Sequence, residues 1–112
     1  MVVSIRFLDQ RRFKKWFSGL APQAIARVTK ALNKLEKAAS SSSHLPGDVR
    51  ALGEGLYELR VHERPGYRIY FFRKDDSIYV VGFGTKRTQQ ADIHGARQLK
   101  KHYEARGAET SK

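Results

Sequence analysis

Cysteine is absent from this 112-residue chain, and acidic residues are scarce, with 11 aspartates and glutamates against 22 lysines and arginines. Without cysteine the chain has no disulfide, no thiolate nucleophile and no cysteine-ligated zinc, and we expect a reducing, cytoplasmic location. No apolar run approaches the roughly 18 residues that a membrane-spanning helix needs. Charged residues interrupt the first apolar segment from Arg6 onward, so we expect neither a secretory signal core nor a membrane partner.

Patterns typical of metal sites are missing as well. The four histidines stand at positions 44, 62, 94 and 102, without metal-ligand spacing and without a flanking cluster of carboxylates. We therefore expect no metal and no other cofactor, so any chemistry should come from the chain's own side chains.

Positive charge is what the chain has in abundance. Its formal net charge is +11 at pH 7, and such a surface attracts nucleic-acid phosphates or an acidic protein partner. A hydrophobic fraction of 40% and an aromatic fraction of 11% are too high for a disordered chain of this charge. The length fits a single domain, 1–112, in which we expect residues 107–112 to form a disordered tail.

Hydrophobic periodicity divides the chain into helices and strands. Apolar residues at helical spacing predict two successive helices, with Phe13, Trp16, Phe17 and Leu20 on the first and Ile25, Val28, Leu32 and Leu35 on the second. A third helix is predicted from Gln89 to about Arg106. Strands are predicted at 2–8, 49–52, 56–63, 67–73 and 78–83, and a serine-rich loop at 39–47. The fold class is therefore α+β: an antiparallel twisted sheet with an N-terminal helical hairpin and a C-terminal helix. We expect two layers, with the helices on one face of the sheet.

Period-two alternation sorts the side chains of the two central strands onto opposite faces. The face expected to meet the helices is apolar, with Tyr57, Leu59, Val61, Ile69 and Phe71. The other face is expected to be open, with Glu58, Arg60, Arg68 and Tyr70 on it and Lys86 and Arg87 at its rim. An open basic and aromatic face suits single-stranded nucleic acid. A second interpretation stays open: the arginines solubilise the sheet or pair with Glu58, and the cations of the second helix form a solvated surface.

Three segments carry a family resemblance. They are 47–60, which ends in Leu-Tyr-Glu-Leu-Arg, 66–71 (Gly-Tyr-Arg-Ile-Tyr-Phe) and 84–93 (Gly-Thr-Lys-Arg-Thr-Gln-Gln-Ala-Asp-Ile). With these motifs the sequence resembles the RelE/ParE superfamily of type II toxin–antitoxin toxins. It is most similar to the phage-related, HigB-like "addiction module killer" branch. The resemblance implies a RelE-like, microbial RNase-like fold.

The resemblance also implies an activity. RelE-type members cleave mRNA in the ribosome without a metal, through attack of the ribose 2′-hydroxyl on the adjacent phosphate. Arg60, Arg68 and Lys86 match the cations of the family's catalytic face, with Arg87 as an alternative to Lys86. Two positions depart from RelE: Ile93 stands where RelE has a functional tyrosine, and Glu58 where RelE has a lysine. Glu58, Tyr70 and His94 are therefore further candidates for proton transfer or base stacking.

The partners implied are a cognate antitoxin, expected to be a helix-turn-helix DNA-binding protein, together with the ribosome and mRNA. Operator DNA would be reached only through the antitoxin. Two alternatives remain at this point: a ParE-like inhibitor of DNA gyrase, and a non-catalytic RNA-binding module.

Overall fold

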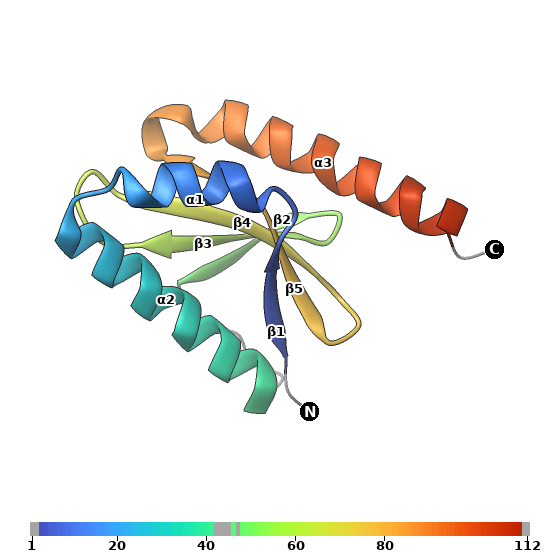
Figure 1. The fold of residues 1–112 in the computed structure, drawn as a ribbon, viewed down its shortest axis with the longest axis horizontal. Helices are drawn as coiled ribbons and strands as arrows, with labels where there is room; N and C mark the ends of the chain where they lie inside the picture. The colour runs from blue at the N-terminus through green and yellow to red at the C-terminus, as the bar shows by residue number, and fades with distance from the viewer. Residues whose placement is uncertain (1–2, 42–45, 47, 111–112) are drawn as a thin grey trace.

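A five-stranded sheet in the order β1-β5-β4-β3-β2 forms the middle of the domain (Figure 1). The computed structural model describes residues 3–41, 46 and 48–110. The strands are β1 (Ser4–Phe7), β2 (Val49–Gly53), β3 (Leu56–Val61), β4 (Tyr67–Lys74) and β5 (Ser77–Thr85). Strands β2 to β5 form the predicted antiparallel meander. Strand β1 departs from it and pairs parallel with β5, because no tight turn joins these two strands and fixes them antiparallel.

The predicted helical hairpin is present on one face of the sheet. Helix α1 (Gln10–Ser18) begins after Asp9, whose side chain accepts a hydrogen bond from the backbone N–H of Arg12. Such an N-cap satisfies one of the N–H groups that a helix start leaves unpaired. Helix α2 (Pro22–Ser41) follows, with Val28 and Leu35 completely buried. Most of the predicted serine-rich loop lies outside the described residues.

The first core lies between this hairpin and the sheet. As predicted from alternation, Leu59, Val61, Ile69 and Phe71 all point into it, and Tyr57 packs at its edge. Phe13 of α1 stacks on Phe7 and Phe17 there. The local patterns therefore assigned this face correctly.

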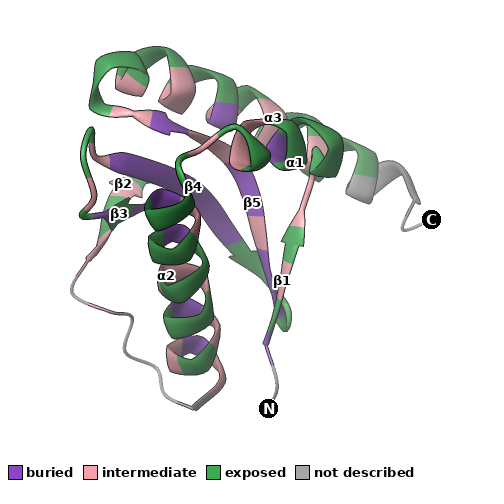
Figure 2. Cartoon of the chain, turned by 60° about the vertical axis from the view of Figure 1, so that its left-hand side comes forward, coloured by how far each residue is buried: buried purple, intermediate pink, exposed green. Residues whose placement is uncertain are grey.

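Helix α3 (Gln89–Thr110) lies on the opposite face of the sheet, so the predicted two-layer arrangement is wrong. A short 3-10 turn, η1 (Lys86–Thr88), leads from β5 into it. The helix packs on β5 and β4 and closes a second core, made of Leu56, Tyr70, Phe72, Val81 and Ala96. Residues Tyr67–Phe72 of β4 are buried on both faces, which Figure 2 shows as a continuous purple strand. Helix α3 also runs to Thr110, past the predicted end near Arg106 and into the segment predicted as a disordered tail.

A bulge in β5 adjusts the sheet to α3. Tyr70 pairs with Gly82 while Phe71 pairs with Val80, which leaves Val81 as the extra residue. A β-carbon at Gly82 would lie 3.2 Å from the Ala96 side chain, so glycine at this position permits the close approach of the helix. Among the helices described, none is long and apolar enough to cross a membrane.

Candidate catalytic and nucleic-acid site

Two arginines face each other at the centre of the candidate site. Arg60 on β3 pairs directly with Arg68 on β4. Opposed residues of an antiparallel pair have β-carbons about 4.5–5.5 Å apart on the same face, where like charges destabilise the sheet. Glu58 lies on this face too, and its Oε2 is 3.6 Å from Nε of Arg68. Arg60 is exposed and has no ion pair within the described chain. One positive charge is thus left unbalanced at this position, where an anion would offset it.

Glu58 and Arg68 form the floor of the site beneath the start of α3. Glu58 is 0% exposed and Arg68 6% exposed. Gln89, the first residue of α3, donates a hydrogen bond from Nε2 to Glu58 Oε2 over 2.7 Å. The expectation of an open face is therefore wrong for Glu58, Arg68 and Tyr70, because α3 covers them. Only Arg60 of that set remains exposed.

The buried pair keeps unused hydrogen-bonding capacity. Oε1 of Glu58 and Nε of Arg68 have no hydrogen-bond partner among the described residues, and the same is true of the Tyr70 hydroxyl. Buried polar groups without partners are rare in stable cores and often occur at sites of chemistry. These three atoms are therefore able to form further hydrogen bonds within the site.

Tyr70 stands opposite Glu58 in the sheet and is fully buried. Burial raises the pKa of its phenol well above the ordinary value, and the negative charges of Glu58 and Asp92 raise it further. Tyr70 therefore keeps its proton throughout the physiological range and sits in the cluster as a neutral group.

A glycine allows α3 to close down beside the arginine pair. Gly84 pairs with Arg68, and a β-carbon there would lie 1.9 Å from Asp92 Oδ2 and 2.7 Å from Thr88 Oγ1. Thr88 donates a hydrogen bond to that Asp92 oxygen. The space that any other side chain at position 84 would fill is thus occupied by the first turn of α3.

The remaining predicted cations lie where the chain leaves the sheet. Lys86 and Arg87 are both exposed on η1, which begins two residues after Gly84, the partner of Arg68. The topology therefore places this basic turn at the same end of the sheet as the opposed arginines. His94 is different. Ile93 and Ala96 pack on the sheet, so the exposed His94 points away from the helix face that contacts the sheet. The structure therefore does not bring His94 into the cluster.

Residues 15–104 match the protein family described as phage derived protein Gp49-like (DUF891). The chain belongs to the Gp49-like family. An uncharacterized protein of Haemophilus influenzae is 29% identical to it over 99 residues, which cover 87% of this chain and 94% of that protein.

The fold of the Gp49-like chain is also found among solved structures. The free form of a mutant E. coli toxin RelE superposes with a TM-score of 0.63 at 16% sequence identity, over 88% of this chain and 98% of that one. At this identity the likeness concerns the fold. The family match agrees with the predicted phage-related branch, and the structural match confirms the predicted α+β, RelE-like fold.

Two polar residues of the Gp49-like site were not predicted from the sequence. Arg50 on β2 is exposed and pairs directly with Glu58, so it lies on the same face as Arg60 and Arg68. The pairing of Arg50 with Glu58 depends on a register shift between Ala51 and Gly53. Alternation within a single strand does not reveal such a shift. Gln89 had been placed at the start of a helix, but its bond to Glu58 joins segments 31 residues apart.

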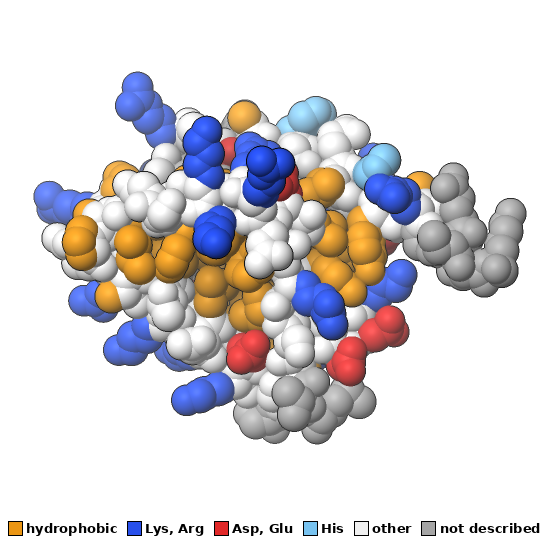
Figure 3. Space-filling view, viewed as in Figure 1, with side chains coloured by type: hydrophobic (Ala, Val, Ile, Leu, Met, Phe, Trp, Pro, Cys, Tyr) orange, Lys and Arg blue, Asp and Glu red, His pale blue; other side chains and the backbone are white. Residues whose placement is uncertain are grey.

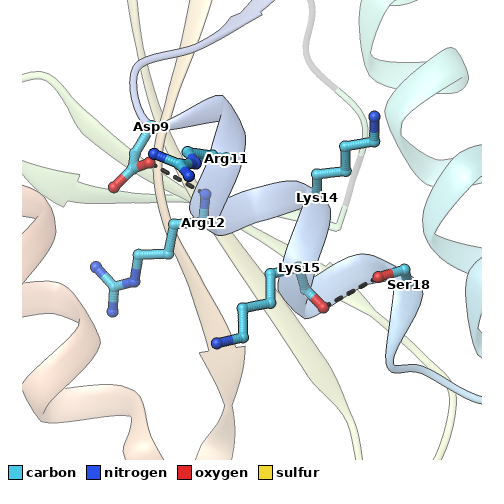
Figure 4. Close-up of a pocket in the computed structure, with 6 residues that line it drawn as sticks. All are labelled: Asp9, Arg11, Arg12, Lys14, Lys15 and Ser18. Carbon is cyan, nitrogen blue, oxygen red and sulfur yellow. Dashed lines mark hydrogen bonds between the residues drawn. The ribbon is translucent and has the colours of Figure 1, made fainter.

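Positive charge in the Gp49-like protein extends well beyond this cluster. Figure 3 shows lysine and arginine side chains spread over the visible face, with few acidic ones. An open hollow of about 640 Å³ on α1 is lined by charged and polar residues: Asp9, Arg11, Arg12, Lys14, Lys15 and Ser18. Figure 4 shows Arg12 and Lys15 extending to one side of α1 and Lys14 to the other, so these cations do not converge. The hollow also lies on the α1 side of the sheet, away from Glu58 and Arg68, and we assign it no chemistry.

A metal centre finds no support in the part of the chain that the structure describes. No group of three or more histidine, aspartate or glutamate residues there is arranged to hold a metal ion. The chemistry that this cluster offers is that of fixed cations around a small anion.

Proposed function

We propose that the chain is the toxin of a type II toxin–antitoxin pair and that it cleaves mRNA on translating ribosomes. The observation that carries the proposal is the directly opposed pair of Arg60 and Arg68, of which Glu58 balances only one charge. A sheet retains such a pair at a cost in stability, and a bound phosphate removes that cost.

The proposed reaction is a transesterification within the RNA backbone. The 2′-oxygen forms a bond to the neighbouring phosphorus while the bond from phosphorus to the 5′-oxygen breaks. The proton of the 2′-hydroxyl is lost, the 5′-oxygen gains a proton, and a 2′,3′-cyclic phosphate is left. Negative charge grows on the phosphate oxygens as the new bond forms, and fixed cations at that position lower the barrier.

Exposure divides the roles of the residues. Arg60, Lys86 and Arg87 are exposed and can reach a phosphate, so we assign them to charge stabilisation. Arg68 adds its charge from the floor, and Glu58 with Gln89 positions its guanidinium. Tyr70 stays neutral beneath them. The proposal therefore rests on the cations, and Glu58 and Tyr70 act as positioning residues.

The partners follow from the same proposal. A cognate antitoxin, of the helix-turn-helix DNA-binding kind, would neutralise the toxin, and operator DNA would be bound through that antitoxin. The ribosome presents the message, and the charge of +11 favours docking on ribosomal RNA.

Primer extension on a reporter message in a cell-free translation system tests the activity. The wild-type protein should produce cuts at fixed positions within codons, and only when the message is translated. Arg60→Thr should lower the cleavage rate by about 100-fold or more, the usual effect of losing one group that stabilises the transition state. Arg73→Thr is the matched control, because Arg73 is also an exposed arginine on a strand but lies toward the other end of β4.

Two results would overturn the proposal. Equal cleavage by Arg60→Thr and wild type would remove the opposed arginines from the mechanism. Full-length message from a preparation that still stops bacterial growth would exclude the nuclease, and a DNA supercoiling assay would then test gyrase inhibition.

A further inference from the structure

A second basic site lies beside α2, at the end of the sheet where β3 finishes. It is a cavity of about 220 Å³, and four basic residues line it: Arg27, Lys30 and Lys34 from α2, and Arg60 from β3. Figure 3 shows basic side chains along the lower left of the molecule, where α2 runs in Figure 1. Arg60 is therefore shared between the opposed arginine pair and this cavity.

The acidic residues around the cavity are already paired. Asp48 contacts His62 over 3.0 Å, and Glu63 contacts Arg27 over 3.5 Å. Lys30, Lys34 and Arg60 have no ion pair with any described residue. Four cations, Arg27, Lys30, Lys34 and Arg60, therefore stand around this cavity against two carboxylates, Asp48 and Glu63, and the surplus of positive charge favours an anion.

The two lysines are placed as a pair. They stand four residues apart, so they project from one face of α2, whereas Val28 and Leu35 turn into the core. Like charges at this spacing destabilise a helix. As with the opposed arginines, a bound anion would turn this repulsion into a favourable contact.

We propose that this cavity is a subsite for a backbone phosphate of the RNA, next to the phosphate that is cleaved. The assignment rests on the proposed function, because Arg60 links the cavity to the candidate catalytic site. An RNA strand that places one phosphate at the exposed Arg60 would carry its neighbouring phosphate toward Lys30 and Lys34, which line the same cavity. The ligand class is therefore a single-stranded RNA backbone, held by charge and without reading the bases.

Binding of a short fluorescent 2′-O-methyl RNA tests the subsite separately from cleavage, because this RNA lacks the attacking hydroxyl. Affinity is measured by anisotropy from low to high salt for wild type and for Lys30→Ala/Lys34→Ala. Each lost lysine–phosphate contact should lower the salt slope by about 0.7, or about 1.4 for the pair, equivalent to about 25-fold weaker binding at 0.1 M salt. Alanine suits a helix, and a Lys30→Gln/Lys34→Gln variant checks that the loss comes from charge.

The matched control is Lys14→Ala/Lys15→Ala, which removes the same charge from exposed positions of α1. A loss confined to the α2 variants supports the subsite. Equal losses in both helices, or none in either, would overturn it in favour of diffuse attraction. If poly-aspartate binding depends on Lys30 and Lys34 while RNA binding does not, the cavity takes an acidic protein and the RNA assignment falls. Wild-type protein that fails to cleave translated message, yet shows the selective RNA loss, would refute the nuclease and leave the subsite standing.

Discussion

Replacing Arg68 with methionine should unfold this protein more easily, and the size of the effect should depend on pH. Methionine keeps most of the length of the buried arginine side chain but removes its charge. Glu58 would then be left fully buried, with its ion-pair partner gone and with a hydrogen bond from Gln89. Removing one partner of a buried ion pair typically costs about 3–5 kcal/mol, because the other charge stays in a poor solvent.

Protonation of the stranded carboxylate sets an upper limit on this cost. A stranded carboxylate can take up a proton, and keeping an ordinary glutamate protonated at pH 7 costs about 3.7 kcal/mol, at 1.36 kcal/mol for each pH unit above its usual titration near 4.3. The 3.6 Å separation between Glu58 and Arg68 is also longer than that of a close charge-assisted hydrogen bond. We therefore expect Arg68→Met to lower the free energy of unfolding by about 2–4 kcal/mol at pH 7, and by less as the pH falls toward 5.

Urea unfolding followed by tryptophan fluorescence measures this effect. Trp16 is the single tryptophan and packs against Tyr67 and Phe83 in the first core, so its emission reports the folded state. The double variant Glu58→Gln/Arg68→Met should recover much of the loss, because no buried charge is stranded. Arg73→Met, at an exposed position, should change the free energy of unfolding by less than about 0.5 kcal/mol.

A loss below about 1 kcal/mol for Arg68→Met, unchanged between pH 5 and 7, would refute this reasoning. Such a result would mean that Arg68 does not stabilise the buried negative charge of Glu58. The prediction also affects any activity assay, since loss of cleavage in an Arg68 variant could reflect loss of the fold.

Two further substitutions test the packing around the cluster. Tyr70→Phe removes a buried hydroxyl that lies beside Glu58 without a well-aligned hydrogen bond, so the free energy of unfolding at pH 7 should change by less than about 1 kcal/mol. Because the pKa of Tyr70 is raised above its ordinary value of 10.0, wild-type stability should fall as the pH rises through 10, and urea unfolding between pH 8 and 11 should show a shallower fall in the variant. Gly84→Ala should cost about 1–3 kcal/mol, because the added methyl overlaps Asp92. In a thermal unfolding series Asp92→Ala should restore part of that loss, and an unchanged Gly84→Ala melting temperature would contradict the close packing of α3.

The sequence predicted what depends on local pattern. Helical spacing around Phe13 and Val28, and alternation through Leu59 and Ile69, identified the elements and the face under α1 and α2. These signals are reliable because each element carries its own apolar stripe. Alternation also put Glu58, Arg60, Arg68 and Tyr70 on one face, and the register of β3 and β4 bears that out.

The position of α3 could not be obtained in the same way. Its packing depends on the two glycines of β5 and on a bulge, which matter only once the helix and the sheet meet. One local sign was present: Tyr70, Phe71 and Phe72 form an uninterrupted apolar run, which is typical of a strand buried on both faces. The run therefore indicates that the sheet face carrying Glu58 and Arg68 is covered, but it does not identify α3 as the cover.

Arg68 is buried and Arg60 is exposed, so the two opposed arginines should contribute differently to stability. At Arg60 we expect a substitution to raise the free energy of unfolding while it lowers the rate of cleavage. Arg60 is exposed and repelled by Arg68 across the strand pair, so Arg60→Thr replaces an unfavourable cation with a good strand former. We expect a gain of about 0.2–1 kcal/mol in the free energy of unfolding, measured from the urea midpoint, together with the loss of message cleavage. Arg68→Met should lose both. A variant at Arg60 that is destabilised by more than about 0.5 kcal/mol would show that this arginine supports the sheet, and the argument from an unbalanced charge to a phosphate site would then fail.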